Sequence, residues 1–86
     1  MENKVLIKVI LPDIDESFDI FIPVNEYVWK VKKLLLKAIS DLSSISINID
    51  LNYVVINRDN GRIYNDNEII INTDIRNATE LLLVVL

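Results

Sequence analysis

Few side chains in this sequence of 86 residues are suited to acid–base or nucleophilic chemistry. Because the sequence contains no histidine and no cysteine, Ser-His and Cys-His nucleophiles, histidine-based zinc sites and disulfide bonds are excluded. The remaining candidates are carboxylates, and Asp13, Asp15 and Glu16 are a close group that could supply an acid and a base. We expect these three carboxylates to lie in a solvated turn and not in an acid–base site. We therefore expect no catalytic residue and no enzyme activity, although an enzyme that uses carboxylates alone stays formally open.

A second polar stretch, residues 57–68, is rich in Asn and Asp and contains the single glycine of the sequence, Gly61. A calcium loop of the EF-hand type has glycine at its sixth position and ligands at its first and third. With Gly61 sixth, those two positions hold Ile56 and Arg58, which do not bind calcium. We therefore expect no metal site and no cofactor. Asn60-Gly61 predicts a hairpin turn, because both residues tolerate positive φ.

One helix is expected beside these polar turns, over residues 26–42 with Asn25 as its N-cap. At 100° per residue, its apolar side chains gather on one side and its polar ones on the other, as in an amphipathic helix. The apolar side holds Val28, Val31, Leu35, Ala38, Ile39 and Leu42. The opposite side holds Lys30, Lys33, Lys37, Ser40 and Asp41.

The remaining apolar runs predict strands at residues 4–11, 17–24, 53–57, 62–64 and 80–86. Residues 43–52 alternate like a strand but could also cross below the sheet as a loop, and the sequence leaves both readings open. The first and last strands are the most apolar, so we expect them side by side and parallel at the sheet centre. The sequence predicts one α+β domain over residues 1–86, a β-grasp whose mixed four- to five-stranded sheet is covered by the helix.

The overall charge and the length of the apolar runs indicate which ligands and which cellular location to expect. A net charge of −4 argues against nucleic-acid binding, which needs many cations on one face. The sequence contains no stretch of 18 apolar residues, so we expect no membrane insertion. The first residues do not have the pattern of a signal peptide. We expect a cytoplasmic protein.

The order of elements and the spacing of core positions resemble ubiquitin from Lys4 to Val85. The matching core positions are Phe18, Ile20, Ile22, Val28, Val31, Leu35, Ile75, Leu81 and Leu83. The resemblance implies a structural ion pair between Lys32 on the helix and Asp66 after the fourth strand. Conjugated ubiquitin-like proteins end in a Gly-Gly tail, whereas the only glycine here is Gly61, so we do not expect a conjugated modifier.

Among ubiquitin-like proteins without that tail, the sequence resembles the YukD/EsaB type of type VII (WXG100) secretion systems in Gram-positive bacteria. The similarity lies in YVVINRDNGRIYNDNEI and IINTDIRNATELLLV, although Ala78-Thr79 stands where those proteins commonly have Gly-Asp. It implies a non-enzymatic accessory or regulatory protein that binds secretion components. The alternative is a general bacterial β-grasp interaction module of another assembly.

Two surfaces are candidates for protein contacts. The outer face of the sheet is expected to carry an interaction patch made of Leu6, Lys8, Ile10, Leu82 and Val84. This patch could bind a partner or a second copy of the chain. The outward side of the helix is expected to carry a basic face made of Lys30, Lys33 and Lys37. The sequence leaves open the partner's identity, the oligomeric state and whether the protein promotes or restrains secretion.

Overall fold

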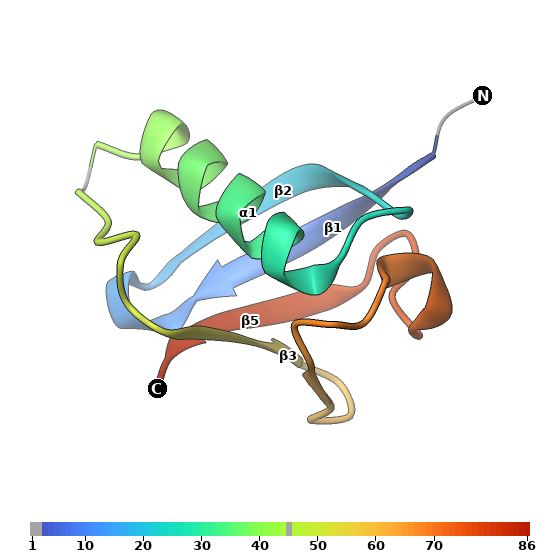
Figure 1. Cartoon of the computed structure of the whole chain (residues 1–86). Coiled ribbons are helices and arrows are strands. Elements are labelled where there is room, and N and C mark those ends of the chain that lie inside the picture. The colour runs from blue at the N-terminus through green and yellow to red at the C-terminus, as the bar shows by residue number, and fades with distance from the viewer. Residues whose placement is uncertain (1–2, 45) are drawn as a thin grey trace.

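The computed structural model describes residues 3–44 and 46–86, which form five strands, one long helix and two short 3-10 helices (Figure 1). The strands are β1 Lys4–Leu11, β2 Glu16–Pro23, β3 Tyr53–Asn57, β4 Ile63–Tyr64 and β5 Glu80–Val85. The helices are η1 Pro12–Ile14, α1 Val28–Leu42 and η2 Ile70–Asn72.

All five strands form one sheet in the order β2-β1-β5-β3-β4, and α1 lies across one of its faces (Figure 1). β1 and β5 are parallel neighbours at the centre, while β1–β2, β3–β5 and β3–β4 are antiparallel. The predicted mixed sheet covered by one helix is confirmed, and the number of strands is five.

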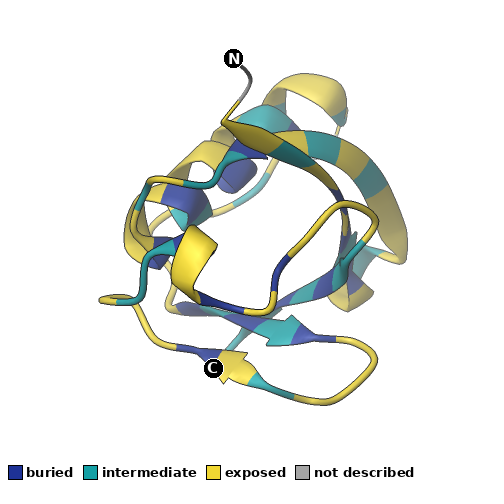
Figure 2. Cartoon of the chain, turned by 90° about the vertical axis from the view of Figure 1, so that its right-hand side faces the viewer, coloured by how far each residue is buried: buried dark blue, intermediate teal, exposed yellow. Residues whose placement is uncertain are grey.

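The core lies between α1 and the inner face of the sheet, where Figure 2 shows the buried positions gathered. Alternation along the strands sends one set of side chains inward, and helical spacing sends a second set down to meet them. Each large apolar side chain buried there contributes about 1.5–3 kcal/mol to stability. The principal core residues are Ile7, Val9, Ile22, Val28, Val31, Leu35, Leu36, Ile39, Val55, Leu81 and Leu83.

The helix begins two residues later than predicted, and its N-cap is Tyr27 and not Asn25. No side chain caps it. Instead, the backbone N–H of Val28 donates to the carbonyl of Glu68 (2.9 Å), and a distant part of the chain thereby satisfies a group that a cap would otherwise bind. At the other end, Leu42 was expected to be buried but is 65% exposed, and Leu36 takes its place in the core.

The described residues of the 43–52 segment form turns and bends and no strand; residue 45 lies outside the described part. Ile47 packs against the core, whereas Ile49 is 62% exposed. The Tyr53 hydroxyl donates to the carbonyl of Asn48 (2.9 Å), which holds this loop against the start of β3. The loop reading of this segment is therefore the correct one.

Ala78, just before β5, has left-handed backbone with φ 72°. This conformation places its N–H 2.8 Å from the carbonyl of Leu6, and the Asn77 side chain accepts the Leu6 N–H at 2.8 Å. Residues 77–78 thus extend the contact between β1 and β5 beyond the strands. A residue with a Cβ adopts this φ at a cost of about 1–2 kcal/mol, which glycine would avoid.

Candidate interaction surface

The outer face of the sheet carries the predicted interaction patch, because the alternate residues of β1 and β5 are buried on the inner face. Ile7, Val9 and Leu81 are almost fully buried. Their neighbours along the strands therefore point away from α1. All five patch residues lie on this outer face: Leu6, Lys8, Ile10, Leu82 and Val84.

An apolar row crosses four of the strands on this face. Ile10 of β1 is paired with Leu82 of β5, Leu82 with Ile56 of β3, and Ile56 with Ile63 of β4. We call these four residues the apolar row. Ile63 is 57% exposed, and the other three are half-buried. The pair Val54–Val84 lies alongside and widens the apolar area.

A charged row borders the apolar row on the same face. Lys8 is paired with Asp19 of β2 on one side and with Glu80 of β5 on the other. Arg58 extends the charged row, because its Nη1 lies 2.5 Å from Glu80 Oε1. Opposite charges alternate along these four residues, so each cation lies beside a carboxylate.

The charged row divides the predicted patch into two apolar areas. Ile10, Leu82 and Val84 lie on one side of Lys8. Leu6 lies on the other side, where it is paired with the highly exposed Phe21. The larger of the two areas is centred on the apolar row.

Sequence reasoning left Val54, Ile56 and Ile63 out of the patch. The alternation in Tyr53–Asn57 already carried part of the signal, because Val54 and Ile56 must point opposite to the buried Val55. Their position beside Leu82 depends on strand register, which the sequence alone does not supply.

Lys32 and Asp66 meet as an ion pair, with Lys32 Nζ 2.7 Å from Asp66 Oδ1. Lys32 Nζ also donates to the carbonyl of Tyr53 (2.8 Å). The Lys32 side chain is 18% exposed and that of Asp66 is 57% exposed. The contacts of Lys32 connect α1 with β3 and with the turn after β4.

The three lysines of the basic helix face have different surroundings. Lys30 Nζ lies 3.7 Å from Glu26 Oε2, one helical turn earlier. Lys33 Nζ lies 5.3 Å from the centroid of the Trp29 ring, within the range of a cation–π contact. Lys37 is exposed. The face is therefore positive, and only part of its charge is neutralised by a neighbouring carboxylate.

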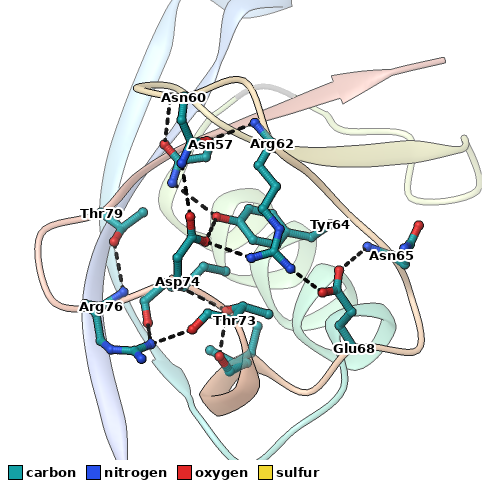
Figure 3. A network of polar contacts seen from close by, with 12 residues as sticks. Asn57, Asn60, Arg62, Tyr64, Asn65, Glu68, Thr73, Asp74, Arg76 and Thr79 are labelled. Atoms are coloured by element: carbon teal, nitrogen blue, oxygen red, sulfur yellow. Dashed lines mark hydrogen bonds and ion pairs between the residues drawn. The ribbon is translucent and has the colours of Figure 1, made fainter.

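A polar network joins β4 to the segment before β5 (Figure 3). The Tyr64 hydroxyl donates to Asp74 Oδ1 (2.5 Å) and accepts from Asn57 Nδ2 (3.1 Å). Asn60 Nδ2 donates to Asp74 Oδ2 (3.0 Å), and the Arg62 guanidinium contacts both Asp74 and Glu68. This network holds the β3–β4 hairpin against residues 73–76.

Burial and hydrogen bonding shift the pKa values in this network. Burial, and then the hydrogen bond to Asp74, raise the pKa of Tyr64 to about 12. The hydrogen bond from Tyr64 lowers the pKa of Asp74, with further help from Asn60 and Arg62. Asp74 is therefore charged and Tyr64 neutral near neutral pH, which is the pairing that the hydrogen bond requires.

The carboxylates that could have done acid–base chemistry lie apart from these contacts. Asp13 and Asp15 are exposed between β1 and β2, and Glu16 is exposed at the start of β2. Across residues 3–44 and 46–86 there is no group of acidic side chains arranged to hold a metal ion. In the same residues, no helix has the length and apolar character needed to cross a membrane.

No protein-family model and no curated protein sequence matches this chain. Several solved structures are similar to it. The N-terminal ubiquitin-like domain of the 4931431F19Rik protein is 22% identical with a TM-score of 0.74, over 100% of this chain and 78% of that one. The ubiquitin-like domain of an Arabidopsis thaliana protein is 15% identical with a TM-score of 0.69, and the match covers 98% of this chain and 79% of that one.

A third similar structure is a chain of the ESX-5 inner membrane complex. It is 10% identical with a TM-score of 0.69, and the match covers 99% of this chain but 21% of that one. At these identities the comparisons bear on architecture, and two of the three matched chains are described as ubiquitin-like domains. The chain therefore has a ubiquitin-like β-grasp fold.

Proposed function

We propose that this chain is a non-enzymatic ubiquitin-like protein that works by binding other proteins with the outer face of its sheet. Its proposed setting is the cytoplasmic side of a type VII (WXG100) secretion system, as an accessory or regulatory component. The observation that carries the binding role is the apolar row of Ile10, Leu82, Ile56 and Ile63, which remains partly open to solvent across four strands.

The apolar row has the character of the centre of a protein interface, and the charged row that of its rim. Burying apolar side chains against a partner is favourable by about 25 cal/mol for each Å² removed from water. Charged residues at the border contribute less to affinity and more to orientation and specificity. Lys8 and Glu80 stand at that border.

The secretion setting rests on sequence resemblance to the YukD/EsaB type in the hairpin region and in the approach to β5. The occurrence of the same fold in a chain of the ESX-5 inner membrane complex is consistent with a place in a large assembly. The proposed role is non-covalent.

The test is genetic complementation. The gene is deleted in its host, WXG100 protein export is measured, and the wild-type gene and variants are reintroduced. We expect the deletion to change export and the wild type to restore it. Ile63→Glu and Leu82→Glu, which place a charge in the apolar row, should fail to restore it.

Phe21→Glu is the matched control, since it introduces the same charge on the same face beyond the charged row. Circular dichroism establishes that each variant is folded, and Ile63→Glu is the safer variant because Ile63 is more exposed. Unchanged export in the deletion strain would refute the secretion role. Full restoration by both apolar-row variants would show that the outer face is not the working surface.

The alternative is a β-grasp interaction module of another assembly, and the same variants separate it from the leading proposal. A partner that is lost with Ile63→Glu while export is unaffected would support the alternative. Self-association is measured by sedimentation. If the partner is a second copy, the wild type should sediment as a dimer and the Leu82→Glu variant as a monomer.

A further inference from the structure

A groove on the helix side of the molecule, opposite the outer face of the sheet, runs between the second half of α1 and the loop that follows it. Figure 1 shows this loop descending from the end of α1 to the start of β3. The groove is lined by Lys33, Leu36, Lys37, Ser40, Ile49 and Asp50. We call it the helix groove.

The helix groove combines an apolar interior with a basic rim. Leu36 is buried in the core and forms part of the groove's floor, whereas Ile49 is 62% exposed. Ile49 offers most of the apolar surface that a bound side chain would remove from water. Lys33 and Lys37 stand one helical turn apart and add two positive charges.

These two lysines differ from the other lysines of α1. Lys30 is paired with Glu26, and Lys32 is paired with Asp66. Among the residues that the structure describes, neither Lys33 nor Lys37 has a carboxylate within ion-pair distance. Lys33 is instead held over the Trp29 ring. The ammonium groups of Lys33 and Lys37 are thus available to a ligand.

The net charge of α1 is also opposite in sign to that of the whole chain. The whole sequence has a net charge of −4, yet Val28–Leu42 contains four lysines and one aspartate. Only one of the 13 Asp and Glu residues of the sequence lies in α1, so an acidic ligand meets an excess of positive charge on this helix. Complementarity of this kind steers association and selects the partner's sign.

We propose that the helix groove binds an acidic segment of a partner protein that carries bulky apolar side chains. The segment's carboxylates pair with Lys33 and Lys37, while an apolar side chain packs between Leu36 and Ile49. This site goes beyond the proposed function, because it lies across the molecule from the apolar row. The protein can therefore hold a second partner while its sheet is occupied.

Asp50 provides a second test of the proposal, because its side chain lines the helix groove and has a charge opposite to that of Lys33 and Lys37. Its carboxylate repels an acidic ligand and would attract a basic one. Replacing Asp50 with Asn should therefore raise the affinity for an acidic peptide. A residue with a merely structural role would not produce a gain.

The binding test uses synthetic peptides of one length on the full chain, followed by NMR and by the fluorescence of Trp29, the only tryptophan. The acidic apolar peptide carries Glu and Leu at helical spacing. A second peptide replaces each Glu with Lys, and a third replaces each Leu with Ser. We expect the first alone to shift the amide signals of Leu36, Lys37 and Ile49.

Equal shifts from the Ser-containing peptide would reduce the contact to charge alone and overturn the groove proposal, as would the absence of shifts with all peptides. Anionic phosphatidylglycerol vesicles are tested in parallel. Binding to vesicles without binding to the acidic apolar peptide would identify a lipid surface as the ligand and would also overturn the proposal.

The variants assign the binding to the groove. Lys33→Glu with Lys37→Glu should weaken peptide binding by about tenfold or more, since two exposed pairs are lost and two repulsions added. Lys4→Glu with Lys30→Glu changes the net charge equally but lies outside the groove, and should have a much smaller effect. Asp50→Asn should strengthen binding about twofold to fivefold. Equal weakening by both lysine pairs would overturn the proposal.

Discussion

Tyr64 of β4 donates its hydroxyl proton to Asp74, which lies between η2 and β5, across 2.5 Å. This hydrogen bond connects two segments that no strand pairing joins. It also couples the protonation of Asp74 and of Tyr64 to folding, at opposite ends of the pH scale.

Asp74→Asn should lower the free energy of unfolding by about 1–2 kcal/mol near neutral pH, because a charge-assisted acceptor is lost. The folded pKa of Asp74 lies below its ordinary value of 3.8, so its contribution is present above that value. The contribution disappears as the pH falls through the lowered folded pKa. Urea unfolding of both proteins across this range should show the two stabilities converging in acid. A constant difference would contradict this assignment.

Tyr64→Phe should remove a loss of stability at alkaline pH. The folded pKa of Tyr64 is raised to about 12 from 10.0, so the unfolded chain loses this proton first. The wild type should therefore lose stability as the pH rises from 10.0 towards 12, by about 2 kcal/mol. All other ionisable side chains are the same in both proteins, so the difference between the two unfolding curves isolates Tyr64. Parallel curves would mean that this hydroxyl is not protected.

The Lys32–Asp66 pair should show a coupling energy of about 0.5–1 kcal/mol in a double-mutant cycle of Lys32→Met and Asp66→Asn. The value is modest because Asp66 is more than half exposed, although Lys32 is well covered. Thermal unfolding of the four proteins at low and high salt measures it, and salt should reduce it. The pair Lys30–Glu26, which is longer and more open, provides a comparison with a smaller expected value. Additive effects at low salt would rule out a structural role for the pair.

Ala78→Gly should stabilise the protein by about 0.5–1 kcal/mol. Glycine relieves the left-handed backbone at φ 72°, and the greater freedom of the unfolded chain offsets part of the gain. Ala38→Gly, in the middle of α1, is the control and should destabilise by about 1 kcal/mol. Chemical unfolding measures both. A loss of stability at position 78 would mean that the Ala78 methyl group makes contacts that outweigh its strain.

Local patterns were sufficient for most of the helix, the strands and the core, because side-chain spacing along one segment determines which face is apolar. They failed where a distant segment decides the outcome. The N-terminus of α1 is bound by the backbone carbonyl of Glu68, so the side chain of Asn25 is not needed as a cap. The described residues of the alternating 43–52 segment pair with no strand, which the segment's own sequence does not reveal.

The candidate surface was predicted in part for the same reason. Leu82 and Ile10 follow from alternation within their own strands, whereas the contact of Leu82 with Ile56 depends on the register of β3 against β5. The Lys32–Asp66 contact was reached through resemblance to ubiquitin. The helix groove requires the path of the loop after α1, which brings Ile49 beside Leu36.

The central pairing of β1 with β5 has a consequence for synthesis of the protein. Val9 meets Leu81, so the inner seam of the sheet joins residues from the two ends of the sequence. Until the ribosome has released β5, the β1–β2 hairpin and the β3–β4 hairpin have no shared neighbour, and their apolar edges stay open. Such distant contacts make folding slow compared with a helical bundle. The nascent chain should therefore acquire protease resistance in one late step, after residues 80–85 have emerged.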